Sequence, residues 1–109
     1  MSIARNVFVD KDYIYIEDLV EQCCALSVTD AVGAYNIGSG RGTPLNEILE
    51  LIRQVTSREL NVEYIPQKTY DVSRFVLDTT KARECLMDIH LTALDAGVEK
   101  LWQWILSEF

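Results

Sequence analysis

The stretch Lys11-Asp12-Tyr13-Ile14-Tyr15-Ile16-Glu17-Asp18-Leu19-Val20 contains the signals of a strand and of a helix in direct succession. Residues 13–16 are aromatic or β-branched, which favours an extended strand. Glu17 and Asp18 then place negative charge where the first turn of a helix is stabilised by it. An apolar stripe continues through Val20 and Cys23. The pattern predicts a short strand followed by a helix over residues 17–27.

The neighbouring segments repeat this alternation of strand and helix signals. Residues 7–9 predict another strand before a turn at residues 10–12, and residues 34–37 predict a third. The turn Gly38-Ser39-Gly40-Arg41-Gly42 follows, and Thr43-Pro44 combines an N-cap residue with a proline at the first helical position. Apolar residues at helical spacing then predict a helix that ends near Ser57.

The last part of the chain adds two short strands and two helices. Residues 61–65 and 75–77 predict strands, and Asp78-Thr79-Thr80 predicts the cap of a helix through Leu86. Thr92-x-x-Asp95 is a capping-box variant before a closing amphipathic helix. We therefore expect an α/β chain, an α+β-like small domain of short strands and about four helices, with residues 1–109 forming a single domain.

The amino-acid composition argues against some classes of binding partner. The chain has 109 residues, 49% of them hydrophobic, and a net charge of −7. This composition is globular, and the negative charge argues against nucleic acid, which needs a basic surface. No apolar run approaches the ~20 residues that span a bilayer, so we expect no membrane partner. The three cysteines lack disulfide or zinc spacing, which predicts free thiols and a cytoplasmic location.

Few residues indicate chemistry on their own. The glycine-rich turn has the spacing G-x-G-x-G, without the last glycine of a dinucleotide loop and without the Lys-Ser/Thr pair of a P-loop. A lone His90 predicts no catalytic triad, and no cluster of metal ligands occurs. The carboxylate pairs Asp10/Asp12 and Glu17/Asp18 are expected to be solvated caps or turns. Two lysine-containing loops, residues 11–13 and 66–71, would neutralise a diphosphate if folding brought them together.

Five motifs in order resemble those of the extended short-chain dehydrogenase/reductase family. Residues 11–20 resemble R-D-[FY]-I-[YH]-[VI]-x-D-L, residues 35–40 resemble [YF]-N-[IL]-G-[SG]-G, and residues 43–52 resemble the helix that follows it. Pro66-x-Lys68-x-x-Asp71-Val72 is similar to P-x-R-x-x-D-V and is followed by the matching residues 77–82. Residues 96–104 resemble E-G-[IL]-x-x-T-x-x-W. Within this family, the residues of the motifs resemble most those of nucleotide-sugar epimerases such as the UDP-galactose/UDP-glucose 4-epimerases.

The resemblance implies the carboxy-terminal substrate-binding region of an NAD-dependent epimerase or dehydratase. In the family, this region closes over the nucleotide-sugar, while an amino-terminal Rossmann domain holds NAD and performs the chemistry. The motifs matched here belong to the substrate region, and no G-x-x-G-x-x-G loop occurs. We therefore expect no cofactor and no catalytic residue in this chain, NAD in the full-length parent, and no hydride transfer by the chain alone.

The resemblance also assigns binding residues. In the family, the arginines of R-D-[FY] and P-x-R-x-x-D hold the nucleotide diphosphate, and the aspartate of the second motif contacts the nucleoside. These positions fall on Lys11, Lys68 and Asp71. Both arginines are lysines here, so point charges replace the planar bidentate fork. Arg41, in the glycine-rich turn, is a further candidate on the nucleobase side, and the implied ligand is a UDP- or dTDP-linked sugar.

Two alternatives stay open. One is a non-catalytic interaction domain that keeps the fold but not ligand binding, as the two Arg-to-Lys differences suggest. The other is a free-standing nucleotide-binding enzyme that uses residues 38–42. Separately, strand edges exposed by the missing Rossmann partner are expected to promote a homodimer.

Overall fold

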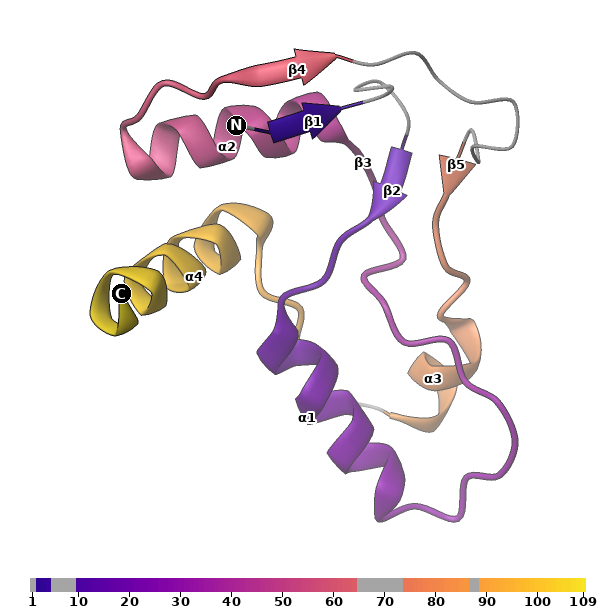
Figure 1. Cartoon of the computed structure of the whole chain (residues 1–109). Helices are drawn as coiled ribbons and strands as arrows, with labels where there is room; N and C mark the ends of the chain where they lie inside the picture. The colour runs from indigo at the N-terminus through magenta and orange to yellow at the C-terminus, as the bar shows by residue number, and fades with distance from the viewer. Residues whose placement is uncertain (1, 5–9, 65–73, 87–88) are drawn as a thin grey trace.

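The computed structural model describes residues 2–4, 10–64, 74–86 and 89–109, in which short strands alternate with helices (Figure 1). This confirms the predicted mixed α/β class. The helices are α1 (Ile16–Ser27), α2 (Leu45–Thr56), α3 (Thr80–Cys85) and α4 (Leu94–Glu108). The strands are β1 (Ser2–Ala4), β2 (Asp10–Asp12), β3 (Gly42–Pro44), β4 (Val62–Tyr64) and β5 (Arg74–Phe75).

Strand β2 lies at the centre of a three-stranded sheet. It pairs antiparallel with β3 and parallel with β5, so that Lys11 lies opposite Thr43 on one side and Phe75 on the other. A separate two-stranded sheet pairs β1 with β4 in parallel, with Ser2 opposite Val62. Because β2 is paired on both sides, the backbone around Lys11 is the most firmly held part of either sheet.

Helices α2 and α4 lie side by side, and α2 also contacts β3 (Figure 1). The Arg58 guanidinium lies 5.3 Å from the centre of the Trp102 ring, a cation–π contact between the end of α2 and α4. Near the start of α4, Gly97 is buried, and a Cβ atom there would lie 3.3 Å from the Cβ of Tyr15. The absence of a side chain at Gly97 thus lets α4 approach the segment between β2 and α1.

The predicted strands differ most from the structure. Residues 13–15 are irregular, and residues 34–37 form no strand. Instead the polar triplet 10–12, predicted as a turn, is the central strand, because its backbone finds partners on both sides. The strand predicted over residues 75–77 is the two-residue β5, and the one predicted over residues 7–9 lies outside the described residues.

Two predicted helix caps are also wrong. Thr43 is a buried residue of β3, and α2 begins at Leu45 with Pro44 in the N-cap position. Helix α4 begins at Leu94 after Ala93, with no side-chain cap, because the Thr92 hydroxyl donates to Asp18 of α1 instead. In both cases a partner distant in sequence replaces the local cap.

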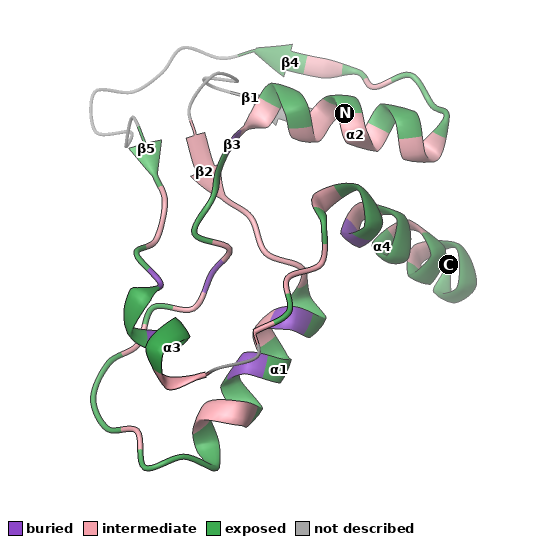
Figure 2. Cartoon of the chain, turned by 180° about the vertical axis from the view of Figure 1, so that it is seen from behind, coloured by how far each residue is buried: buried purple, intermediate pink, exposed green. Residues whose placement is uncertain are grey.

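The described residues enclose very little core. Ala82 is the single hydrophobic residue among them that is buried, while Asp18, Gln22, Thr43 and Thr79 are buried polar residues (Figure 2). The chain exposes 7811 Å², against about 6,100 Å² for a typical folded monomer of this mass. Its radius of gyration is 16.1 Å, against about 13 Å for a compact domain of this length. Much apolar surface is therefore left uncovered.

Candidate functional site

The carboxylate of Asp12 is the centre of a hydrogen-bond cluster beside Lys11. It accepts hydrogen bonds from the Ser39 amide (2.8 Å), the Ser39 hydroxyl (2.7 Å), the Gly40 amide (3.0 Å) and the Leu77 amide (3.2 Å). Burial by itself would raise the pKa of Asp12, but the hydrogen bonds from Ser39, Leu77 and Gly40 outweigh it, so that the pKa lies below its usual value. Asp12 thereby joins β2, the glycine-rich turn and the residues after β5.

This cluster decides the role of the glycine-rich turn. The amides of Ser39 and Gly40, which a phosphate would need, already donate to Asp12. Strand β3 also separates the turn from the start of α2, so the turn does not open directly onto a helix N-terminus. A Cβ atom at Gly38 would lie 2.8 Å from Leu77 Cδ1 and 3.1 Å from Asp12 Oδ2. The glycines serve close packing, which argues against a phosphate site in residues 38–42.

Further contacts fasten the same turn to the region around α3. Asn36 Nδ2 donates to the Asp78 carbonyl at 3.3 Å, and Arg83 donates to the Ser39 carbonyl at 3.2 Å. Lys81 Nζ donates to the Ala34 carbonyl at 2.9 Å and lies 4.2 Å from the centre of the Tyr35 ring. Segments distant in sequence thus form one framework around β2.

Lys11 lies within this framework, half-buried between Asp10 and Asp12 in β2. Asp10 faces Arg74 of β5, with 3.6 Å between Oδ2 and Nε. Lys68 and Asp71 lie outside the described residues, so the structure neither brings them to Lys11 nor separates them from it. They precede β5 by six and three residues in the sequence, and β5 pairs with the strand that contains Lys11.

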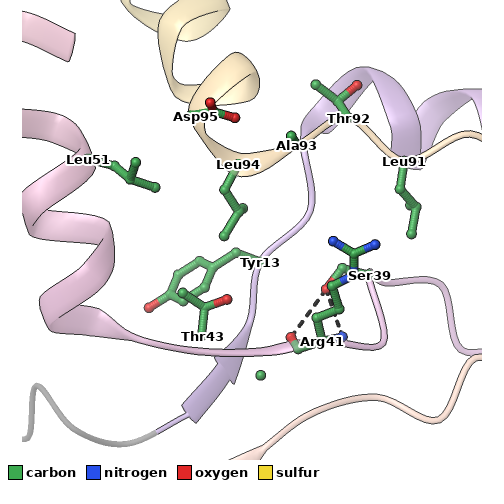
Figure 3. A pocket seen from close by; sticks show the side chains of 11 residues that line it. Tyr13, Ser39, Arg41, Thr43, Leu51, Leu91, Thr92, Ala93, Leu94 and Asp95 are labelled. Atoms are coloured by element: carbon green, nitrogen blue, oxygen red, sulfur yellow. Dashed lines mark hydrogen bonds between the residues drawn. The ribbon is translucent and has the colours of Figure 1, made fainter. Parts of the chain in front are cut away.

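A cavity of about 410 Å³ opens on the other side of the turn (Figure 3). Arg41 and Thr43 line it together with Tyr13, whose pKa is raised by burial. Residues 91–95, which lead into α4, form the opposite wall. The structure therefore places Arg41 at a cavity that also offers an aromatic ring. Thr43 joins this cavity to Lys11, because it lines the cavity and pairs with Lys11 across the sheet.

The sequence interpretation missed Asp18. It was expected to be solvated, yet it is 3% exposed and accepts hydrogen bonds from the Thr92 amide (2.6 Å) and the Thr92 hydroxyl (2.8 Å). No local signal could have found it, because Asp18 lies away from the apolar stripe of α1, a position that indicates solvent exposure. Its role is structural, since both carboxylate oxygens hold the segment before α4 against α1.

Other reactive groups form no site in the part of the chain described. No three His, Cys, Asp or Glu side chains there are grouped to hold a metal ion. Cys23, Cys24 and Cys85 are free thiols. Among the same residues no helix has the length and apolar character to cross a membrane.

One spacing in the sequence imitates the family's catalytic Tyr-x-x-x-Lys pair. Tyr64 and Lys68 are four residues apart, a spacing that brings two side chains together on a helix. Tyr64, however, is the last residue of strand β4 and is 66% exposed. Lys68 also belongs to the segment 66–72 that resembles P-x-R-x-x-D-V, and Tyr64 lies just before that segment, so the spacing alone carries no catalytic assignment.

Comparison with known proteins agrees with this framework. No family model matches the chain. UDP-arabinose 4-epimerase 1 of Arabidopsis thaliana is 30% identical over 98 residues, which cover 86% of this chain and 23% of that protein. The structure of UDP-glucose 4-epimerase from Thermotoga maritima with UDP-glucose superposes with a TM-score of 0.81 at 27% identity. The match covers 96% of this chain and 35% of the Thermotoga chain.

The chain is a homologue of the UDP-sugar 4-epimerases. It has the fold of the corresponding part of these epimerases, and it spans about a third or less of the length of these relatives. UDP-glucose 4-epimerase from Bifidobacterium longum, solved with NAD⁺ and UDP, shares the fold at a TM-score of 0.83 and 19% identity, over 97% of this chain and 35% of that one. These two solved neighbours of the chain thus hold UDP-glucose in one case and NAD⁺ with UDP in the other.

Proposed function

We propose that this chain is the nucleotide-sugar-binding part of a UDP-sugar 4-epimerase. In this proposal Lys11 and Lys68 hold the diphosphate, and Asp71 contacts the nucleoside. The observation that carries it is the pairing of β2 with β5. Strand β5 directly follows the segment that contains Lys68 and Asp71, and it lies against the strand that contains Lys11. The solved relatives with UDP-glucose and with UDP supply the class of ligand.

The charges around Lys11 are compatible with an anion there. The Asp12 carboxylate accepts hydrogen bonds from three amides and a hydroxyl, and Asp10 faces the Arg74 guanidinium. Their negative charge is therefore largely engaged by other groups. Lys11 can attract a phosphate oxygen as a point charge, although it holds the oxygen with less direction than an arginine would.

The cavity beside Tyr13 supports a place for the rest of the ligand. Its volume of about 410 Å³ is within the ~300–1,000 Å³ typical of small-molecule sites. We assign Arg41 to the nucleobase side, because its position on the cavity wall lets it contact a ring through hydrogen bonds or stacking. A UDP-linked sugar suits this arrangement, and the dTDP-linked alternative stays a prediction.

In this proposal the chain binds the nucleotide-sugar but does not catalyse the epimerase reaction. The NAD and the catalytic groups are assigned to the part of a 4-epimerase that the chain does not match. We therefore expect the chain alone to lack epimerase activity. We also expect its location to be cytoplasmic. The Bifidobacterium relative was solved with NAD⁺ and UDP together.

Titration of UDP into the 109-residue chain tests the proposal, with backbone amide shifts as the readout. We expect shifts that cluster at β2, β5 and residues 65–73. Lys11→Ala should weaken binding about tenfold or more, because a charge-assisted hydrogen bond is worth about 1.5–3 kcal/mol. Lys11→Arg should tighten binding several-fold, because it restores the bidentate fork.

Lys100 provides the matched control, since it is an exposed lysine of α4 whose loss changes the net charge equally. Lys100→Ala should leave the UDP affinity within about twofold, apart from weak long-range electrostatics. Equal effects of the two lysine variants would contradict the assignment of Lys11. A chain that shows no response to UDP at all would favour the non-catalytic interaction domain.

A further inference from the structure

Arg41 borders a second hollow besides the cavity assigned to the nucleobase. This second hollow has a volume of about 410 Å³ and is mainly polar. We name it the arginine hollow, and its described lining consists of Arg41, Arg83, Leu86, Ile89 and Leu91. Two cationic side chains thus meet an apolar wall, and this lining contains no carboxylate. Such a combination of a few charged groups with apolar side chains is typical of small-molecule sites.

Arg83 is held in place over the glycine-rich turn. It belongs to the last turn of α3, and its Nη2 donates to the Ser39 carbonyl at 3.2 Å. The same nitrogen would lie 3.0 Å from a Cβ atom at Gly40, so the guanidinium rests directly on the residue before Arg41. An arginine has five N–H donors. The bond to Ser39 therefore fixes the guanidinium and leaves donors for a ligand.

Arg41 is shared between the arginine hollow and the cavity of Figure 3. It lines both, as does Leu91. In Figure 3 the Arg41 side chain extends from the glycine-rich turn toward Leu91. The ion pairs that the described residues form are those of Arg53 and Arg74, and neither arginine of the hollow takes part in them. Both guanidiniums therefore keep their charge for an anion.

The chemistry of two guanidiniums favours a phosphate as that anion. The planar fork of an arginine binds phosphate or carboxylate oxygens in pairs. A carboxylate has only two oxygens, whereas a phosphate monoester has three free oxygens and a charge of about −1.5 to −2 near neutral pH. The monoester can thus engage two forks at once. Its organic part would then lie against the apolar wall of Leu86, Ile89 and Leu91.

We propose that the arginine hollow binds a phosphate monoester, and that this ligand competes with the nucleobase for Arg41. The second ligand and its site go beyond the proposed function. The competition rests on the proposed function, because it uses the assignment of Arg41 to the nucleobase. One guanidinium cannot serve both hollows fully, so each ligand should weaken the binding of the other by the same factor.

Titration of phenyl phosphate into the intact 109-residue chain tests the site, with backbone amide shifts as the readout and ionic strength held constant by sodium chloride. We expect saturable shifts at residues 39–42 and in α3, with a Kd of about 1 mM or tighter. Inorganic phosphate should bind several-fold more weakly, because it makes no contact with the apolar wall. Arg83→Gln should weaken the binding of phenyl phosphate about tenfold or more. Arg83→Lys, which keeps the charge but not the fork, should lie between these values.

Arg53→Gln is the matched control, because it removes the same charge from an exposed arginine of α2. It should change the affinity for phenyl phosphate by less than about twofold. Arg83 is exposed as well, so Arg83→Gln should leave the urea midpoint nearly unchanged, which separates lost binding from lost folding. Absence of saturable binding, or equal effects of Arg83→Gln and Arg53→Gln, overturns the proposal. A loss of UDP affinity in Arg83→Gln as large as the loss for phenyl phosphate also overturns it, because the hollow would then belong to the nucleotide.

A UDP titration with and without saturating phenyl phosphate tests the competition. We expect UDP to bind several-fold more weakly when the arginine hollow is occupied, and Arg41→Gln to abolish this difference. A UDP affinity that phenyl phosphate leaves unchanged overturns the shared use of Arg41. A chain that binds phenyl phosphate through Arg83 but shows no response to UDP contradicts the proposed function and not the site. The two proposals therefore fail in different ways.

Discussion

The carboxylate of Asp12 holds three segments of this chain together. Its partners lie 27, 28 and 65 residues away in sequence, in the glycine-rich turn and after β5. Lys11 is the neighbouring residue in β2. The same cluster that fixes the turn therefore also fixes the backbone of the lysine that we propose to bind the diphosphate. The neighbouring aspartate and lysine of one short strand thus have separate tasks, one in folding and the other in binding.

Removal of the Asp12 carboxylate should destabilise the chain. Asp12→Ala is expected to lower the free energy of unfolding by about 2–3 kcal/mol near neutral pH, because hydrogen bonds to a charged group are among the stronger ones. Urea denaturation followed by circular dichroism measures this change. Asp10→Asn is the control, because Asp10 makes only a half-exposed ion pair at 3.6 Å, and it should cost less than about 1 kcal/mol. Equal losses in the two variants would contradict the role of Asp12.

The lowered pKa of Asp12 predicts how stability depends on pH. The folded pKa lies below that of the unfolded chain, which is about 3.9. The contribution of Asp12 is therefore complete above about pH 4 and is lost as the pH falls through the folded pKa. Asp12→Asn should flatten the acid slope of stability, measured by urea midpoints at a series of pH values. Asp78, whose pKa is also lowered, remains in that variant and leaves a residual slope.

At the scale of elements, the helices were predictable and most strands were not, although residues 61–65 predicted β4 (Val62–Tyr64). The apolar period of residues 45–55 predicts α2 to within two residues, because a repeat over three turns is a local property. Strand β2 has the sequence Asp-Lys-Asp and forms because β3 and β5 supply its backbone partners. Such a strand depends on contacts distant in sequence. Its polar residues alone indicated a turn.

The contact between α1 and the segment before α4 gives a prediction at this scale. Thr92→Val removes the hydroxyl that donates to Asp18 at 2.8 Å and leaves part of a buried carboxylate without a partner. We expect a loss of about 1–3 kcal/mol in the free energy of unfolding. Ser107→Ala is the control, because the Ser107 hydroxyl is exposed and donates to the local Trp104 carbonyl. A loss no larger in Thr92→Val than in this control would show that the contact contributes little.

For the whole molecule, motif order was more informative than composition. Hydrophobic content indicates a globular chain, yet Ala82 is the single buried hydrophobic residue among the described ones. Composition counts apolar residues but does not say whether their partners lie in the same chain. Five motifs in sequence predicted the fold of the epimerases and indicated Lys11 as the proposed ligand residue, whereas the burial of Asp18 required the three-dimensional contacts.

A crystal structure of the 109-residue chain with UDP tests the central claim most directly. We predict a phosphate oxygen within hydrogen-bond distance of Lys11 Nζ, with Lys68 on the same diphosphate and the base on the side of Arg41. Data on the chain without UDP, from the same crystal form, provide the control for ordered water or salt at Lys11. A diphosphate bound to the amides of residues 38–42, or bound away from β2 altogether, would contradict the account.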